Sequence, residues 1–337
     1  MKAVGYYTPG AIDRADSLLD IELPDPKPTA RDLLVHVRAI SVNPADTKFR
    51  ASAKPPEGQA KVLGWDAAGV VAAVGAEVTL FKVGDEVFYA GDATRPGTYS
   101  ELHVVDERIV GHKPRTIGWA EAAALPLTSI TAWELLFDRL RVNYGQKTQA
   151  GALLVINGAG GVGSILIQLA RRLTGLTVIA TASRPETIEW VRRMGAHHVI
   201  DHHQPLDREL KRIGIPQVEY VAGLTGSERH IPALVEAIAP QGHIALIDDP
   251  PSFDIVKFKR KAVTIAWELM FTRPMFQTVD MIQQHHILEE ISALIDAGLL
   301  RTTMTEQLAP INAANLQRVH AHAESGRAIG KSVLVGF

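Results

Sequence analysis

The sequence predicts an α/β protein built from two regions of different texture. From residue 1 to about residue 114, short β-branched runs are broken by Gly, Pro and Asp, a pattern typical of a Greek-key-like β domain. From about residue 116 onward, apolar strand-like runs alternate with helical patterns. Such alternation predicts a doubly wound parallel sheet with helices on both faces. The 337 residues leave room for about two domains.

The individual elements follow in chain order. In the first region, the clearest strand-like runs are residues 33–40, 69–74 and 86–89, with loops at 54–58 and 91–97. Helical patterns follow at 119–125 and 128–140, and another appears at 278–299. Apolar strands of the parallel sheet are expected at 151–157, 176–183, 198–201, 218–222 and 243–248, and a last strand at 330–337.

Composition excludes several classes of function. Hydrophobic residues make up 46% and charged residues 21%, as in an ordinary globular protein. The net charge of −2 argues against nucleic acid or an anionic membrane as the main partner. The absence of cysteine excludes disulfides, thiolate catalysis and cysteine-ligated metals. We expect a cytoplasmic protein, because no apolar run has the length of a membrane span and residues 1–10 lack a secretory core.

The strongest motif is a G-x-G-x-x-G at Gly158, Gly160 and Gly163. It follows an apolar strand and opens a helix whose apolar residues recur every three or four positions, which is the context that the motif requires. Such glycines let the backbone turn tightly and approach a pyrophosphate at the helix N-terminus. The alternative is a glycine-rich turn that binds nothing.

The next strand favours NADPH as the cofactor. An NAD site usually places Asp or Glu at the end of this strand, to accept from the ribose hydroxyls. Here the segment 181–186 reads TASRPE, with Ser183 and Arg184 where a 2′-phosphate would arrive. The alternative is that Arg184 is a solvated charge and Ser183 a helix N-cap. His202 could also lie near the phosphate.

Further motifs follow one another along the chain: VNPAD at 42–46, GWDAAGVV at 64–71, VGDEV at 83–87, ALPLT at 124–128 with TAW at 131–133, and NGAGGVG at 157–163. In this order they resemble the medium-chain dehydrogenase/reductase superfamily over almost the whole chain. The segments ELMFTR at 268–273 and ESGRAIGK at 324–331 are similar to the zinc-free quinone oxidoreductase branch, especially its "zinc-type alcohol dehydrogenase-like" group.

The resemblance implies a GroES-like catalytic domain made of residues 1–125 and 272–337, and a Rossmann NADP-binding domain at 126–271. It also implies a homodimer, in which the strand near residues 263–267 pairs across the interface. In the zinc enzymes of the family, the first metal ligand would align near residues 43–46, and a metal-binding His would align with Trp65. Trp cannot ligate zinc, so we expect no metal. The 13 histidines lack zincin spacing.

The resemblance also implies the site residues. Asn43 would lie near the nicotinamide and donate to a developing oxyanion, or Asn43-Pro44 simply makes a turn. Trp65 would fill the space of the missing metal, or pack in the core. Thr128 would contact the nicotinamide, or be a core helix residue. Asp46 either orients neighbours or caps a helix. The remaining residues expected to bind NADPH, besides Asn43, Thr128, Ser183 and Arg184, are Gly158, Gly160, Gly161, Val162, Gly163, Gly223, Leu224, Thr225, Leu246, Ile247, Asp248 and Lys331.

Together these features predict an NADPH-dependent oxidoreductase that transfers hydride to a quinone or an α,β-unsaturated carbonyl without zinc. Such acceptors need only hydrogen-bond donors and a proton, because hydride addition gives an enolate or quinol anion. One alternative is an alcohol or aldehyde dehydrogenase of the zinc-type family, which would need ligands at Asn43 and Trp65. Another is an NADPH-binding structural or RNA-binding protein, although the basic run at 257–261 is short.

Overall fold

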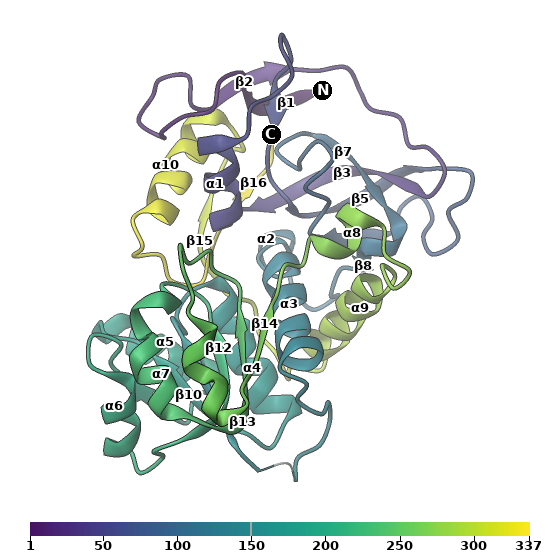
Figure 1. Ribbon diagram of the computed structural model, residues 1–337. Helices are drawn as coiled ribbons and strands as arrows, with labels where there is room; N and C mark the ends of the chain where they lie inside the picture. Colours follow the sequence, from purple (N-terminus) through teal and green to yellow (C-terminus); the bar gives the residue numbers. More distant parts are fainter. Residues whose placement is uncertain (149) are drawn as a thin grey trace. The chain divides into compact units, whose positions relative to one another are not determined.

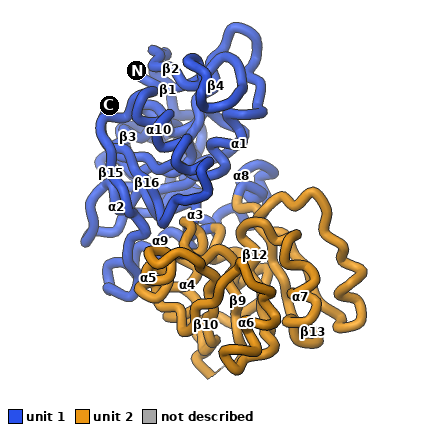
Figure 2. Tube along the Cα trace, turned by 90° about the vertical axis from the view of Figure 1, so that its left-hand side faces the viewer, with its two compact units in different colours: residues 1–130, 271–337 blue, residues 131–270 orange. Residues whose placement is uncertain are grey.

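The computed structural model describes residues 1–148 and 150–337. The chain divides into two compact units (Figures 1 and 2). Unit 1 comprises Met1–Ile130 and Phe271–Phe337, and unit 2 comprises Thr131–Met270. Unit 1 is therefore discontinuous in sequence, and its first boundary falls five residues later than the predicted change of domain after residue 125.

Unit 1 is built on two sheets. The smaller has the order β2-β1-β4 and is antiparallel. The larger has the order β15-β16-β3-β5-β6-β8, with β7 also paired to β3. Only β15 and β16 run parallel among these described pairs. The strands are β1 (Lys2–Tyr6), β2 (Leu19–Glu22), β3 (Asp32–Ser41), β4 (Lys61–Val62), β5 (Asp66–Val74), β6 (Glu86–Tyr89), β7 (Leu102–Asp106), β8 (Val110–His112), β15 (Met304–Leu308) and β16 (Lys331–Val335).

The pairing of β16 with β3 joins the C-terminal segment to the N-terminal half of unit 1. Val333 lies opposite Ser41 across this antiparallel pair. Lys331, two residues earlier, is thereby brought to the end of β3 and the start of α1. The helices and short turns of unit 1 are α1 (Pro44–Ser52), η1 (Glu107–Ile109), α2 (Trp119–Ala123), α8 (Thr272–Phe276), α9 (Gln283–Asp296) and α10 (Ala313–Glu324). α3 (Pro126–Trp133) crosses the boundary between the units.

Unit 2 contains a six-stranded parallel sheet in the order β11-β10-β9-β12-β13-β14. Its strands are mostly apolar, as expected where helices cover both faces. They are β9 (Ala152–Ile156), β10 (Thr177–Thr181), β11 (His198–Ile200), β12 (Val218–Gly223), β13 (Ile238–Leu246) and β14 (Thr264–Trp267). Because all six strands are parallel, their carboxyl ends share one edge of the sheet.

The helices of unit 2 cover the two faces of this sheet. A buried cluster joins Leu154 and Ile156 of β9 to apolar residues of α6, α7 and η4. The alternate residues of β9, Leu153 and Val155, point to the opposite face, and α4 contacts β9 and β10 as well as α5. These elements are η2 (Glu134–Arg139), α4 (Gly161–Leu173), α5 (Pro185–Met194), α6 (Leu206–Arg212), η3 (Ser227–His230), α7 (Ile231–Ala237) and η4 (Ile255–Lys261).

The predicted fold class is confirmed, whereas several element bounds were wrong. The helix predicted at 128–140 is two elements, because α3 ends at Trp133 and a π-helical turn, η2, follows. The helix predicted at 278–299 begins only at Gln283. Strand β13 begins at Ile238, five residues before the predicted strand. Across residues 1–148 and 150–337, no helix combines the length and the apolar character that crossing a membrane requires.

Candidate functional site

In unit 2, the glycine-rich turn lies between β9 and α4 and is fixed by polar contacts to neighbouring strands. Asn157 adopts a left-handed conformation, with φ of 65°. Its N–H donates to the Thr181 hydroxyl at 2.9 Å, and the Gly158 N–H donates to the Thr181 carbonyl at 3.2 Å. The Asn157 amide also donates to the Thr225 hydroxyl at 3.1 Å. The turn is therefore held to the ends of both β10 and β12.

The three motif glycines have different surroundings. A Cβ atom on Gly158 would lie 2.9 Å from the Ala180 Cβ, and one on Gly163 would lie 2.6 Å from the Gly158 carbonyl oxygen. These two glycines are required for packing. A Cβ on Gly160 would meet no described atom closer than 3.5 Å. Gly160 and the neighbouring Gly161 and Val162 are half-buried. The open side of Gly160 at the start of α4 fits the close approach of a dinucleotide pyrophosphate.

The ends of the other strands lie along the same edge of the sheet. Ser183 and Arg184 follow β10, and Arg184 is the N-cap residue of α5. Arg184 lies 3.4 Å from the Glu186 carboxylate. No acidic residue stands at the end of β10 itself. The predicted alternative that Ser183 is the N-cap does not apply, because that position belongs to Arg184.

The predicted residues at the ends of β12 and β13, and just beyond them, are adjacent. Gly223 pairs with Leu246 in the parallel ladder. The Ile247 N–H donates to the Gly223 carbonyl at 3.0 Å. One Asp248 carboxylate oxygen accepts from the Ser227 N–H at 2.8 Å, while the other is buried without a partner among the described residues. The structure therefore brings the segments 223–225 and 246–248 to the same edge as the glycine turn.

In unit 1, Asp66 is the centre of a buried polar cluster. One carboxylate oxygen accepts from the Asn43 amide at 2.8 Å and from the Ser41 hydroxyl at 3.2 Å, and it lies 3.1 Å from the Lys331 Nζ. The other oxygen accepts from the Leu127 N–H at 2.7 Å. Both oxygens of this fully buried side chain are therefore engaged.

Lys331 is also buried and has three acceptors. Its Nζ donates to the Val42 carbonyl at 2.7 Å and to the Asn43 side-chain oxygen, and it pairs with Asp66. An ammonium group has three N–H donors, so each has an acceptor within unit 1. Burial lowers the pKa of Lys331, and the charge of Asp66 opposes this shift. We predicted that Lys331 contacts the cofactor. Such a contact would require Lys331 to give up one of these three bonds for a bond to the cofactor.

The lysine fixes the orientation of the Asn43 amide. Because Lys331 donates to the Asn43 oxygen, the amide nitrogen must face the other way, where it donates to Asp66. An amide nitrogen carries two hydrogens, so one donor is left for a further acceptor. Asn43 also precedes α1, and its backbone N–H donates to the Asp46 carboxylate at 2.6 Å. The turn and oxyanion-donor interpretations of Asn43 are thus compatible.

The other two predicted catalytic residues are buried as well. Trp65 packs against Phe49 and Phe271, with ring centroids 4.9 and 5.2 Å away. Its indole N–H has no partner in the described part of the chain. The Thr128 hydroxyl donates to the Leu125 carbonyl of the preceding turn at 3.1 Å. This bond uses the hydroxyl hydrogen and leaves its oxygen available only as an acceptor.

Asp46, Tyr99 and His320 form a second buried group, in which the sequence predicts a role only for Asp46. Burial raises the pKa of Asp46 to about 7, against the Asn43 N–H and Lys331, which lower it. The Tyr99 hydroxyl lies 3.1 Å from the His320 ring nitrogen Nε2. Burial lowers the pKa of His320 to about 3, so that imidazole is neutral at pH 7. Asp46 is the third residue of α1, so it accepts from the N-cap N–H and does not itself cap the helix.

The donor atoms of unit 1 do not fit a catalytic zinc ion. Zinc sites in proteins use three or four Cys, His, Asp or Glu ligands. No group of three such residues is gathered in a metal-binding arrangement within residues 1–148 and 150–337. Asp66 has both oxygens engaged, and Trp65 supplies no ligand atom. Zinc would require the cluster around Asp66 to be dismantled.

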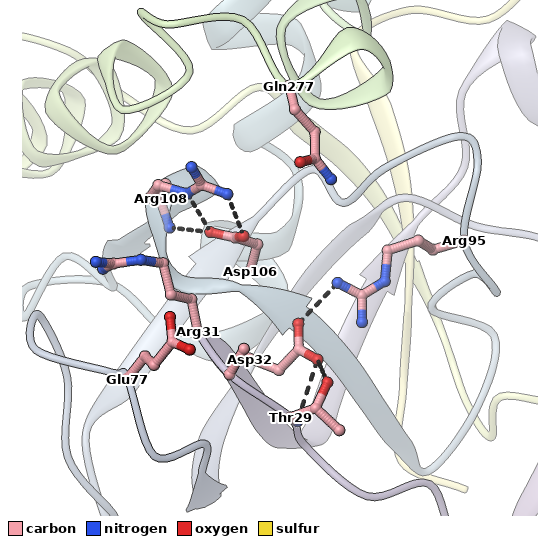
Figure 3. A pocket seen from close by; sticks show the side chains of 9 residues that line it. Thr29, Arg31, Asp32, Glu77, Arg95, Asp106, Arg108 and Gln277 are labelled. Carbon is pink, nitrogen blue, oxygen red and sulfur yellow. Dashed lines mark hydrogen bonds and ion pairs between the residues drawn. The ribbon is translucent and has the colours of Figure 1, made fainter.

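Unit 1 also carries a polar pocket of about 520 Å³ (Figure 3). Three arginines line it, but each already has an acidic partner at 2.8 Å: Arg95 with Asp32, Arg108 with Asp106 and Arg31 with the buried Glu107. Arg108 and Asp106 pair through two N–H groups. These arginines are neutralised, and the pocket has no unpaired charge that would select an anion.

Several residues of the candidate sites had a weak sequence signal or none. Asn157 precedes a glycine, and Asn is one of the few residues that tolerate the left-handed conformation, so its role could have been found. Thr181 lies in the predicted strand, but its contact with the turn depends on sheet register. Tyr99 and His320 are 221 residues apart in the sequence, and no local pattern joins them.

Comparisons with known proteins agree with this architecture. Residues 29–130 match the model of the alcohol dehydrogenase GroES-like domain, and residues 194–334 match that of zinc-binding dehydrogenases. Among curated relatives, a zinc-type alcohol dehydrogenase-like protein of Staphylococcus aureus is 41% identical over 336 residues, 99% of each chain. A quinone oxidoreductase of Pseudomonas aeruginosa is 32% identical over 316 residues, 92% of each chain.

A solved structure from Rhizobium etli CFN 42 is also similar. Its protein, provisionally named a zinc-dependent alcohol dehydrogenase, is 59% identical to this chain. The TM-score is 0.96, and the match covers 100% of this chain and 98% of the other. These matches extend over nearly the full length and include both domain types of one superfamily. The chain therefore belongs to the medium-chain dehydrogenase/reductase superfamily of oxidoreductases.

Proposed function

We propose that the protein is an NADPH-dependent oxidoreductase that transfers hydride to a quinone or an α,β-unsaturated carbonyl without a catalytic zinc ion. One observation carries this proposal: Lys331 and Asp66 hold the Asn43 amide with a hydrogen-bond donor to spare, where a zinc enzyme of the family would hold metal ligands. The similarity to the Pseudomonas aeruginosa quinone oxidoreductase supports the same reaction class.

The chemistry of the acceptor follows from this donor set. A zinc-dependent alcohol dehydrogenase activates its substrate with a Lewis acid, for which the described residues gather no fitting set of ligands. Quinones and conjugated carbonyls become stabilised anions on reduction, so a positioned hydrogen-bond donor is enough to assist them. Asn43 would supply that donor to the developing oxyanion. Trp65 would provide a flat apolar surface where a planar acceptor packs.

NADPH supplies the hydride when it is bound. The backbone at Gly160–Val162 would bind the pyrophosphate, because Gly160 and Gly161 have no Cβ and the first N–H groups of α4 lie there. Ser183 and Arg184 would bind the 2′-phosphate, and no carboxylate at the end of β10 would repel it. Thr225 and Asp248 lie on the same edge and would line the path toward the nicotinamide ribose.

The exposed edge of the unit 2 sheet supports a homodimer. β14 is the last strand of that sheet, with a sheet partner on one side only, β13, among the described residues. Trp267 at its end is 55% exposed, and Leu269 just beyond is 53% exposed. A second copy of the chain would pair with this edge and cover both side chains. Light scattering of the purified protein would test this directly, and a monomer at micromolar concentration would contradict it.

The reaction is tested with chelator-treated protein. NADPH and NADH oxidation would be followed with a small quinone, a simple enone and an aldehyde as acceptors. We expect NADPH oxidation with the quinone or enone. Arg184→Ala should act mainly by raising the KM for NADPH, while Asn43→Ala should lower kcat. Asn43→Asp is the matched control for size, because it loses the amide donor and keeps the volume.

Other results would each contradict the proposal. Activity that returns only with added zinc, or that appears only with NADH and an alcohol, would assign the chain to the zinc-type alcohol dehydrogenases. NADPH binding without any turnover would favour a non-enzymatic role. A salt-dependent shift of RNA mobility in the same preparation would then point to nucleic acid.

A further inference from the structure

His202 lies beside the residue expected to hold the cofactor phosphate. Its Nε2 atom is 3.3 Å from the Ser183 hydroxyl. Ser183 follows β10 and His202 follows β11, and these two strands are parallel neighbours with Thr181 opposite Ile200. Both side chains therefore emerge at the carboxyl edge of the sheet, where a dinucleotide ribose is bound in this type of fold.

The surroundings of this imidazole carry both signs of charge. Arg184 is adjacent to Ser183 and lies 3.4 Å from Glu186. The His202 ring is also in edge contact with the His203 ring, with centroids 4.6 Å apart. Asp201 lies on the same segment, and its N–H donates to Glu209 of α6 at 3.2 Å. The remaining charged or titratable groups on neighbouring elements belong to η3 and are Glu228, Arg229 and His230.

We infer that His202 completes the 2′-phosphate subsite with Ser183 and Arg184, and that it takes up a proton when NADPH binds. This inference rests on the proposed function, because it requires that NADPH is the cofactor. Ser183 and His202 already share a hydrogen bond, so a phosphate oxygen accepting from either group would lie within reach of the other. Imidazole changes charge near neutral pH, and an adjacent dianion favours its charged form.

The direction of the proton movement follows from the charges. Burial lowers the pKa of His202 in the free protein, with His203 acting in the same direction and Asp201 opposing. The free imidazole is therefore neutral at pH 7.5. A bound phosphate dianion raises that pKa, so the extra affinity is present at lower pH and is lost as pH rises through the bound-state pKa. The phosphate's own second pKa is about 6, so it stays dianionic above pH 7.

Calorimetric titration tests the inference. NADPH and NADH would each be titrated at pH 7.5 in two buffers that differ in ionisation enthalpy, which reports the protons taken up. We expect proton uptake with NADPH and none with NADH. His202→Gln should abolish the uptake and weaken NADPH binding about tenfold, the size of one hydrogen bond to a charged group. His203→Gln is the matched control, since it removes the neighbouring exposed imidazole, and should keep the uptake.

The outcomes separate this inference from the proposed function. If His202→Gln binds NADPH with unchanged affinity and proton uptake, the inference is wrong and the NADPH assignment stands. An equal loss of NADPH and NADH affinity would also overturn it, since the imidazole would then serve a part common to both cofactors. If the wild-type protein prefers NADH, the proposed function itself fails. An unchanged thermal unfolding midpoint would show that the variant remains folded.

Discussion

The two units place their polar groups in opposite ways. In unit 1, Asp66, Lys331 and Asn43 are buried and bind one another, so that the carboxylate accepts from four groups. In unit 2, the glycine turn offers backbone and an open surface at Gly160. The first site is rigid because its side chains satisfy each other. The second is receptive because side chains are absent from it.

This difference explains how each site would contribute to a hydride transfer. A buried network of this kind can fix the one remaining Asn43 amide donor precisely, because any other orientation of the amide breaks its bonds to Asp66 and Lys331. A glycine turn can admit a bulky anion without moving, because the required space already exists. Substitutions in the Asp66 cluster should therefore cost folding stability, whereas a substitution at the open surface of Gly160 should cost cofactor affinity.

The largest loss of folding stability is expected from Lys331→Met. It removes the counter-charge of Asp66 and leaves the Val42 carbonyl and the Asn43 oxygen without a donor. Removing one partner of a buried ion pair typically lowers the unfolding free energy by about 3–5 kcal/mol. Urea unfolding followed by circular dichroism would measure the loss. The double variant Lys331→Met/Asp66→Asn should recover part of it, and no recovery would show that the pair is not the cause.

The next largest effect is a pH dependence of folding stability that arises from Asp46. Burial raises its pKa to about 7, whereas an unfolded chain has an Asp pKa of about 4. Its stabilising contribution is therefore full below pH 4 and is lost as pH rises toward 7. As pH rises through this window, the unfolding free energy of the wild type should fall relative to that of Asp46→Asn, by at most about 1.4 kcal/mol per pH unit.

Unfolding midpoints at several pH values would reveal this difference. His320 acts in the opposite direction, because its pKa is lowered to about 3 and its contribution is lost as pH falls below about 6.5. That contribution is common to both proteins, so only their difference reports Asp46. Parallel pH profiles of the two proteins would mean that Asp46 is ionised throughout.

Local patterns in the sequence predicted most of unit 2. The apolar strands, the glycine spacing and the amphipathic helix after it are each contained within about 20 residues, and each was found. The missing acid at the end of β10 was also visible. The contact of His202 with Ser183 does not follow from the sequence alone, because it depends on which strands are neighbours in the sheet.

Unit 1 was predicted mainly through its resemblance to a family. Lys331 and Asn43 are 288 residues apart, and only the pairing of β16 with β3 brings them together. The sequence therefore did not reveal that the lysine is buried with three acceptors. The π-helical turn at Glu134–Arg139 was missed as well, since its apolar spacing reads as a continued α-helix.

A third prediction sets two glycines of one turn against each other. Gly163→Ala places a Cβ 2.6 Å from the Gly158 carbonyl oxygen, and the backbone must shift, at a cost of about 1–3 kcal/mol. Gly160→Ala meets nothing closer than 3.5 Å, so its stability should stay within about 1 kcal/mol of the wild type, while its NADPH affinity falls. Thermal unfolding and cofactor titration of both variants would distinguish these roles. If Gly160→Ala bound NADPH as tightly as the wild type, the pyrophosphate would not bind at this surface.

The smallest effect on stability is expected at the exposed start of α5, where Arg184 and Glu186 lie. Glu186→Gln breaks an ion pair with Arg184 whose side chains are 53% and 32% exposed. Solvent screens such a pair, so the change in unfolding free energy should stay below about 0.5 kcal/mol. NADPH affinity should instead rise two- to threefold, roughly the effect of removing one screened negative charge near a phosphate. NADH affinity serves as the control and should not change. A loss of stability comparable to that of Lys331→Met would mean that charges at this edge are structural, as they are in unit 1, and would end the distinction between the two sites.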